Sequence, residues 1–282
     1  MQWRCRWFAL LQMLGVADRG WFIPYRYKAQ SPAPLDAYPD KAFVAAEDVI
    51  RTTLEAAAVY CKDWTKFAGR PAPPTPRFDQ DWFPGLDAAL LYGFVRAERP
   101  GLIIEVGSGH STRFAARAIQ DEGFEAKIIA IDPAPRADIA KLSPLVELWE
   151  MPLQQADSAV FNALKAGDIL FIDSSHVLMP GSDVDVLFNH VLPGLDDGVF
   201  IHIHDILLPN PYPLAWEWRG YNEQNAVGCL LMGGGFELLA SSHYAETRMA
   251  EDVARLFADL PPSPEGALAT SLWLRKSHFK QL

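Results

Sequence analysis

Apolar and polar positions alternate in a regular order along residues 99–282. Short apolar runs, typical of buried strands, are separated by segments in which apolar residues recur every three or four positions, as in helices. Strands are predicted at 102–106, 127–131, 145–150, 168–172, 199–203, 236–241 and 272–275. Strands that alternate with helices and are apolar on both faces predict an α/β fold with a doubly wound, mainly parallel, seven-stranded sheet.

Residues 1–98 carry a helical pattern interrupted by prolines, with apolar residues at helical spacing over 42–67 and 86–96. The apolar run at 7–16 is too short to span a bilayer, and we expect an amphipathic helix that packs on the body of the protein. Contact with a membrane surface or a partner is the alternative. The chain is therefore divided into a helical N-terminal extension, which could form a lid, and a domain over 99–282.

Composition narrows the function classes. Half of the 282 residues are hydrophobic and the net charge is −10, so nucleic acid and anionic membranes are poor partners. Cys5, Cys61 and Cys229 lie far apart without zinc-site spacing, which favours a reduced, cytoplasmic setting. No integral membrane segment is expected. A homo-oligomer is left open.

The most informative stretch follows the first predicted strand. Two glycines separated by one residue let a ligand approach the backbone closely, and the following helix presents free N–H groups to it. Chains built in this way hold a nucleotide or nucleoside cofactor at the carboxyl edge of the sheet. The residues expected to bind it are Glu105, Gly107, Ser108, Gly109, His110 and Ser111.

Acidic or histidine residues also follow the later strands. Asp132 ends the second strand and is placed to accept hydrogen bonds from ribose hydroxyls, or else it is a loop carboxylate that starts a turn. Asp173 follows the fourth strand, and the pair 204–205, His then Asp, follows the fifth. Because the carboxyl ends of parallel strands share one edge of the sheet, these side chains predict a site there.

The absence of a third glycine narrows the choice of cofactor. A dinucleotide fingerprint needs a third glycine where this chain has Thr112 or Arg113. The motif Glu105-Val-Gly-Ser-Gly instead resembles the first motif of class I S-adenosylmethionine-dependent methyltransferases, over about residues 99–276. The resemblance implies a Rossmann-like methyltransferase fold with S-adenosylmethionine as cofactor. It also implies that the glycine loop contacts the methionine part and that Asp132 holds the ribose.

Three further segments, 171–176, 202–209 and 221–224, resemble a subgroup of small-molecule methyltransferases related to the metal-dependent catechol and macrolide O-methyltransferases. That group binds magnesium through acidic residues after the fourth and fifth strands. Asp173, His204 and Asp205 fall on those positions. Because histidine is a poor magnesium ligand, manganese, iron or zinc would suit this set better, and a bound divalent metal is left open.

Histidines are the candidate bases. His176 stands where the catechol enzymes carry a lysine base, and a histidine with a pKa near 6.5 can remove a proton near neutral pH. His204 is the second candidate, and the alternative for His176 is a hydrogen bond that caps its loop. We expect His202 to face away from His204, toward packing. The catalytic residues are thus predicted to be His176, His204 and Asp173.

The hypothesis is methyl transfer to an oxygen, in preference to a nitrogen, of a small acceptor such as a sugar or a secondary metabolite. Residues 216–224 could close over the acceptor, unless Asn222 only caps the following helix. Two alternatives of other classes stay open. They are an NAD-dependent oxidoreductase and a non-catalytic module that binds a nucleoside or a partner.

Overall fold

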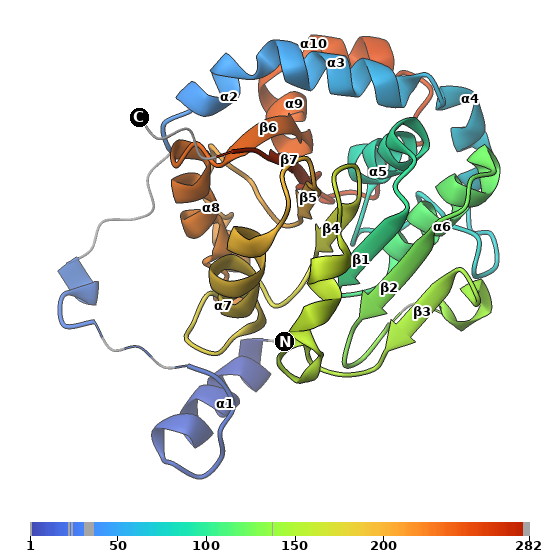
Figure 1. Ribbon diagram of the computed structural model, residues 1–282. Coiled ribbons are helices and arrows are strands. Elements are labelled where there is room, and N and C mark those ends of the chain that lie inside the picture. The colour runs from blue at the N-terminus through green and yellow to red at the C-terminus, as the bar shows by residue number, and fades with distance from the viewer. Residues whose placement is uncertain (1, 22, 24, 31–36, 137, 279–282) are drawn as a thin grey trace.

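A seven-stranded sheet forms the centre of the computed structural model, which describes residues 2–21, 23, 25–30, 37–136 and 138–278 (Figure 1). Its strands are β1 (Leu102–Val106), β2 (Lys127–Ile131), β3 (Val146–Trp149), β4 (Ile169–Ile172), β5 (Phe200–Ile203), β6 (Phe236–Ser241) and β7 (Leu272–Lys276). They lie in the order β3-β2-β1-β4-β5-β7-β6. The first five are parallel, and β7 is antiparallel to both of its neighbours. The predicted fold is confirmed, and every predicted strand is present within about one residue of its expected bounds.

Helices other than α1 pack around this sheet (Figure 1). The helices of the described chain are α1 (Gln2–Met13), α2 (Lys41–Ala45), α3 (Glu47–Ala58), α4 (Cys61–Trp64), α5 (Gly85–Glu98), α6 (His110–Glu122), α7 (Asp183–Val186), α8 (Glu223–Met232), α9 (Ser242–Arg248) and α10 (Ala250–Leu256). The helical stretch predicted over 42–67 is broken into α2, α3 and α4. The backbone leaves helical geometry at Ala46, with φ −101° and ψ 2°, and at Tyr60, with φ −94° and ψ 12°.

The later part of the N-terminal extension belongs to the same hydrophobic core as the sheet. α5 is buried along most of its length and packs against both α3 and α6, while α3 also contacts β6. Close approach of α3 and α5 depends on Gly93, because a Cβ there would lie 2.5 Å from the Cα of Ala57. α5 therefore reaches the interior of the domain, and a lid role for the extension stays a prediction.

The helix α1 stands apart from the sheet and its helices, in the lower part of Figure 1. Trp3, Trp7 and Leu14 are 81%, 55% and 65% exposed. The expectation that this segment packs on the body is therefore wrong. After α1 the chain turns back on the helix instead, because the amide of Val16 donates to the carbonyl of Leu11. Among the described residues, no helix has the length and apolar character needed to cross a membrane.

We predict that Gly93→Ala destabilises the fold by about 1–3 kcal/mol, because the added methyl group would force α5 away from α3. Urea unfolding followed by circular dichroism would measure this loss. Gly194→Ala is the matched control, since a Cβ at Gly194 would meet no atom within 4 Å. Equal midpoints for the two variants would contradict the close packing of these helices.

Candidate functional site

The predicted site residues come together at the carboxyl edge of the sheet. β1 lies between β2 and β4, so the chain order reverses beside it, and this is where open α/β sheets bind ligands. Asp132 follows β2, Asp173 follows β4, and His204 and Asp205 follow β5. All four side chains therefore lie at the edge where β1 turns into α6.

The two glycines of this turn have different roles. Gly107 has φ +86°, and a Cβ there would lie 1.8 Å from the carbonyl oxygen of Asp173. It therefore allows the end of β1 to touch the end of β4. Gly109 has an extended backbone, and a Cβ there would meet no atom within 4 Å. The space for a ligand thus lies beside Gly109.

Glu105 holds the start of α6. It is 2% exposed, and its two carboxyl oxygens accept hydrogen bonds from the hydroxyls of Ser111 and Thr112. Burial raises the pKa of Glu105 to about 8 against the effect of these hydroxyls, and the charges of Asp173 and Asp132 raise it further. Both carboxyl oxygens of Glu105 already have partners within the chain. Direct contact of Glu105 with a cofactor stays a prediction.

Asp132 faces the glycine turn. Its Oδ2 accepts hydrogen bonds from the amide and the hydroxyl of Ser108, at 2.8 and 2.9 Å, and its Oδ1 accepts from the amide of Ala134 at 2.8 Å. The carboxylate is half-buried and lies beside the open space at Gly109. This position suits a ribose partner, although the bond to Ala134 also fits the alternative of a turn-starting carboxylate. The ribose role of Asp132 stays a prediction.

Buried donors without partners lie around the start of α6. They are Nδ1 of His110, Nε of Arg113 and Nε of Arg77, none of which has a hydrogen-bond partner within the described chain. Burial lowers the pKa of His110 to about 4, and the charges of the two arginines lower it further. Donors of this kind at a helix N-terminus fit an anionic group such as the carboxylate of a methionine moiety. The sequence-based prediction did not include either arginine. Arg113 could have been found from its position, because it lies only four residues after Gly109.

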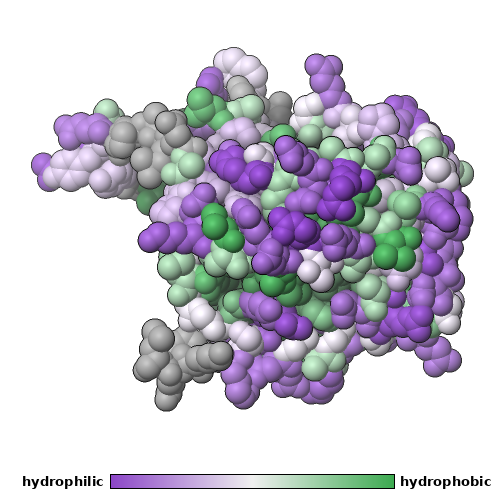
Figure 2. Space-filling model, turned by 90° about the horizontal axis from the view of Figure 1, so that it is seen from above, coloured by the Kyte–Doolittle hydropathy of each residue, from purple (hydrophilic) through white to green (hydrophobic). Residues whose placement is uncertain are grey.

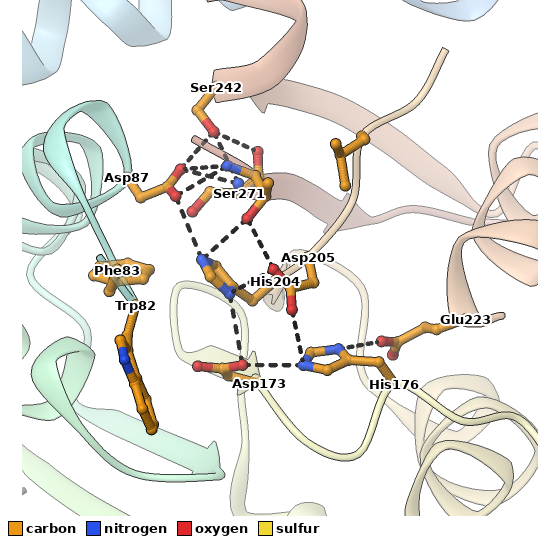
Figure 3. Close-up of polar contacts among 12 residues, drawn as sticks. Trp82, Phe83, Asp87, Asp173, His176, His204, Asp205, Glu223, Ser242 and Ser271 are labelled. Carbon is orange, nitrogen blue, oxygen red and sulfur yellow. Dashed lines mark hydrogen bonds and ion pairs between the residues drawn. The ribbon is translucent and has the colours of Figure 1, made fainter. Parts of the chain in front are cut away.

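His176 lies at the centre of a buried charged cluster (Figure 3). It is 3% exposed, and its Nδ1 lies 2.9 Å from Oε2 of Glu223 at the first position of α8. Its Nε2 lies 3.3 Å from Oδ1 of Asp173 and 3.5 Å from Oδ2 of Asp205. The ring therefore points into the site and is oriented from behind by a carboxylate, as in catalytic histidine–carboxylate pairs.

His204 has a similar arrangement. Its Nδ1 lies 3.6 Å from Oδ1 of Asp173, and its Nε2 lies 3.4 Å from Oδ2 of Asp87 on α5. Asp87 is fully buried and also accepts hydrogen bonds from the amides of Thr270 and Ser271. Asp173 is thus the carboxylate at which the two histidines meet (Figure 3).

The charges in this cluster stabilise one another. Burial alone would lower the pKa of His176 and His204, but the surrounding carboxylates outweigh it and hold both pKa values well above 6.5. Burial opposes the charge of Asp173 as well, yet the two histidines bring its pKa below the usual range. Charges of alternating sign therefore persist in a site that is largely closed to water.

The backbone of the cluster is unusual at two positions. His176 has φ +59° and Asp205 has φ +55°, in the left-handed region that side chains other than glycine rarely adopt. The loop of His176 is held because its carbonyl accepts hydrogen bonds from the amides of Asn222 and Glu223, at 3.1 and 3.3 Å. The carbonyl thus ties the backbone of this loop to α8, and the ring adds its contact with the Glu223 carboxylate. The ring nitrogens remain directed at carboxylates.

Two expectations about neighbouring residues are wrong. Residues two apart on a strand share a face, so His202 lies on the same side as His204, with ring centroids 5.8 Å apart. His202 does serve packing, because it stacks on Phe171 at 3.7 Å and its Nε2 lies 2.8 Å from the hydroxyl of Ser271. The alternative that Asn222 caps α8 through its side chain also fails. Its Oδ1 accepts from the amide of Leu178 instead, at 2.6 Å.

Sequence reasoning gave no role to the two carboxylates behind the histidines. Glu223 lies in a quoted segment, 221–224, but is 47 positions from His176 along the chain. Asp87 carries a clearer signal, since it is an acidic residue in the apolar stretch that predicts α5. A buried acid in such a helix requires a partner, although the sequence does not say which.

A cavity of about 240 Å³ opens beside the cluster. Its walls include Tyr212, Trp216, Tyr221 and Gln224, and Lys28 and Tyr38 from the N-terminal extension line it as well. The ring of Tyr221 lies 4.6 Å from the ring of His176, so the cavity is one side chain away from the charged cluster. The segment 216–224, expected near an acceptor, does line a cavity there.

The part of the chain that contains the glycine turn and the charged strand ends resembles a known protein family. The family model described as "Methyltransferase domain" matches residues 104–206, from β1 to just beyond β5. This part of the chain is similar to methyltransferase domains. The predicted class, an S-adenosylmethionine-dependent methyltransferase with that cofactor, is confirmed. Neither alternative class gains support.

Solved structures show likeness at low identity. A methyltransferase of Podospora anserina, PaMTH1, bound to SAH, is 14% identical over 92% of this chain and 100% of that chain, with a TM-score of 0.44. The branched-chain polyamine synthase from Thermus thermophilus is 15% identical over 99% and 79%, with a TM-score of 0.43. The plantazolicin methyltransferase BpumL in complex with SAH is 12% identical over 85% and 91%, with a TM-score of 0.41. No curated protein matches the chain.

A metal site gains no support from the geometry. Over the part of the chain that the structure describes, no group of three or more His, Cys, Asp or Glu is arranged to hold a metal ion. Two of the expected ligands, Asp173 and His204, instead face other charged side chains of the cluster. Metal binding by Asp173, His204 and Asp205 stays a prediction, and no chemical step below depends on it.

We predict that Glu105→Gln reduces the fall in stability between pH 5 and pH 8. A carboxyl whose pKa rises on folding contributes stability below its unfolded pKa near 4.5 and loses it as the pH rises to about 8. The wild type should therefore lose about 1–4 kcal/mol more than the variant over this range. Thermal unfolding in a pH series would measure it. The exposed Glu125→Gln should keep the wild-type slope, and identical slopes for all three proteins would refute the buried-acid assignment.

Proposed function

We propose that this enzyme transfers a methyl group to the hydroxyl oxygen of a small acceptor that binds in the cavity beside His176. The observation that carries the proposal is the cluster in which His176 is oriented by Glu223 on one side and faces Asp173 on the other. Such a pair is suited to accept the proton of a hydroxyl group, and it lies at the carboxyl edge of the sheet beside the cofactor turn.

The cofactor is proposed to bind along the turn between β1 and α6. Asp132 would accept hydrogen bonds from its ribose, and Gly109 leaves space for its methionine part. The unpaired donors of His110, Arg77 and Arg113 would hold its carboxylate. This placement would bring the reacting methyl group toward Asp173, whose carbonyl already touches Gly107.

The cavity supports a small acceptor with a flat face. The rings of Tyr212, Trp216 and Tyr221 contact one another with centroids 5.9–6.2 Å apart, and two further wall residues supply amide groups. Aromatic walls with a few polar groups orient small molecules. Arg219 stacks on Trp216 at 4.0 Å and approaches Asp205 at 3.6 Å, so it joins this wall to the charged cluster.

The chemistry requires little from the protein beyond alignment and a proton acceptor. When bound, the cofactor supplies a methyl group on a sulfonium sulfur, which is already reactive. The neutral form of His176, which is populated as the pH approaches its raised pKa, would take the hydroxyl proton at Nε2 as the carbon–oxygen bond forms and the carbon–sulfur bond breaks. Glu223 would stabilise the resulting imidazolium, and burial of the cluster would exclude competing water. His204 would keep Asp173 in place.

The reaction class can be tested with radiolabelled S-adenosylmethionine and a panel of small hydroxyl and amine compounds that includes phenols and sugars. We expect label in hydroxyl compounds, and an O-methyl signal in the product by NMR. Labelling of amines alone would overturn the oxygen assignment. With the best acceptor from this panel, His176→Gln and Asp173→Asn should lower kcat by about 10²–10⁴-fold.

The same two variants should bind S-adenosylhomocysteine with nearly wild-type affinity, because neither side chain is proposed to hold the cofactor. His190→Gln is the matched control, since His190 is exposed and should leave kcat unchanged. Unchanged kcat in His176→Gln would remove the proposed base. Lost affinity for the cofactor product would place these residues in the cofactor site instead.

For the cofactor side, we predict that Asp132→Ala weakens binding of S-adenosylhomocysteine at least 10-fold in calorimetry, because two ribose hydroxyls would lose a charged acceptor. Asp138→Ala provides a control, since Asp138 is an exposed aspartate on the same loop. Equal affinities for these two variants would show that Asp132 only shapes the turn.

A further inference from the structure

The helix α1 and the described residues that follow it expose an unusual number of large apolar side chains. Those exposed between Trp3 and Tyr25 are Trp3 at 81%, Trp7 at 55%, Leu10 at 41%, Met13 at 55%, Leu14 at 65%, Val16 at 68%, Trp21 at 54%, Ile23 at 64% and Tyr25 at 60%. Folded proteins rarely leave so large an apolar surface without a partner. Figure 1 shows that α1 projects from the body, where a second molecule could reach it.

The described residues between 2 and 27 fold back on themselves through internal contacts, and we call this segment the hook. The guanidinium groups of Arg4 and Arg19 lie 5.2 and 5.5 Å from the ring centre of Phe8, and the amide of Arg19 donates to the side chain of Gln12. Phe8 is half-buried, whereas Trp3 and Trp7 point outward. The outward stripe of Trp3, Trp7, Leu10 and Leu14 follows one side of the helix.

Charge indicates what the hook binds. Residues 1–28 contain five basic residues and one acid, a net charge of +4 in a chain whose total is −10, which leaves −14 for the rest. The basic residues Arg4, Arg6, Arg19 and Arg26 are exposed. A basic apolar hook and an acidic body are complementary surfaces of the same molecule. Salt screens the interaction of charges that lie more than about 8–10 Å apart. The attraction between the basic hook and the acidic body that it contacts therefore outweighs the repulsion between the two acidic bodies, which lie further apart.

The residue types favour a protein partner over a lipid surface. Helices that lie on membranes separate an apolar face from a strongly charged one. In α1, Arg4 and Arg6 flank the tryptophans, and apolar residues continue on other sides at Phe8 and Ala9. Tryptophan and arginine are the residues that carry most binding energy in protein interfaces.

The area also suits a dimer. Three tryptophans with these exposures present about 400 Å² of surface. In a twofold exchange each copy contributes its hook, so the tryptophans alone would bury about 800 Å², and the other apolar side chains add to this. A stable interface needs roughly 1,200–2,000 Å² in total.

We propose that the hook, described at residues 2–21, 23 and 25–27, is a docking arm that binds the acidic body of a second copy of this chain, so that two copies exchange arms in a symmetric dimer. Each arm inserts its tryptophan stripe against the partner's surface, and its arginines pair with carboxylates there. The proposal does not depend on the methyl-transfer chemistry.

Light scattering with size-exclusion chromatography tests the arm on the full chain. We expect wild type at twice the chain mass of 31.4 kDa. The variants Trp3→Ser/Trp7→Ser/Trp21→Ser and Arg4→Glu/Arg6→Glu/Arg19→Glu should dissociate at least 10-fold more readily. Val59→Ser/Met232→Ser, at apolar residues of the body that are 74% and 75% exposed, is the matched control and should remain dimeric. Circular dichroism and the unfolding midpoint should be the same for all four proteins.

Three outcomes would overturn the proposal. The first is a wild type that stays monomeric at the highest soluble concentration. The second is an arm variant that dimerises as strongly as the control. The third is flotation of wild type with phosphatidylglycerol vesicles, lost in the tryptophan variant, which would assign the arm to a lipid surface instead.

Discussion

The two buried histidines at the carboxyl edge of the sheet require carboxylates from distant parts of the chain, and much of the architecture serves this requirement. Burial of an ionised ring is costly unless charged partners surround it. The partners come from α5 before the sheet, from the ends of β4 and β5, and from the start of α8. The N-terminal extension is thus tied to the site through one side chain, Asp87, as well as through its apolar packing.

The glycine turn at 107–109 and the charged cluster are in direct contact. Gly107 touches the backbone of Asp173, whose side chain is the meeting point of both histidines. A shift of the turn would therefore move the cluster, and a shift of β4 would move the turn. This contact gives a physical reason for the proposal that the methyl donor and the methyl acceptor bind on opposite sides of Asp173.

Much of this could be predicted from the sequence, because the strands are short apolar runs and their ends carry the polar residues. The turn at 107–109 and the placement of Asp132, Asp173, His204 and Asp205 at one edge follow from the parallel order alone. Glu223 and Asp87 could not be assigned, because their pairing with the histidines depends on how α8 and α5 pack. The prediction that α1 packs on the body was wrong. An apolar helix pattern indicates a face that can be buried, but it does not indicate which molecule buries that face.

The left-handed backbone at His176 and Asp205 has a consequence for anyone who seeks a hardier variant of this protein. At both positions glycine or asparagine would relax the main chain, so substitutions chosen only for thermal resistance would converge on them. They would also remove the imidazole and the carboxylate of the proposed catalytic cluster. In the proposed mechanism a gain in stability at these two residues would therefore reduce turnover, and a library intended to improve stability should hold both of them fixed.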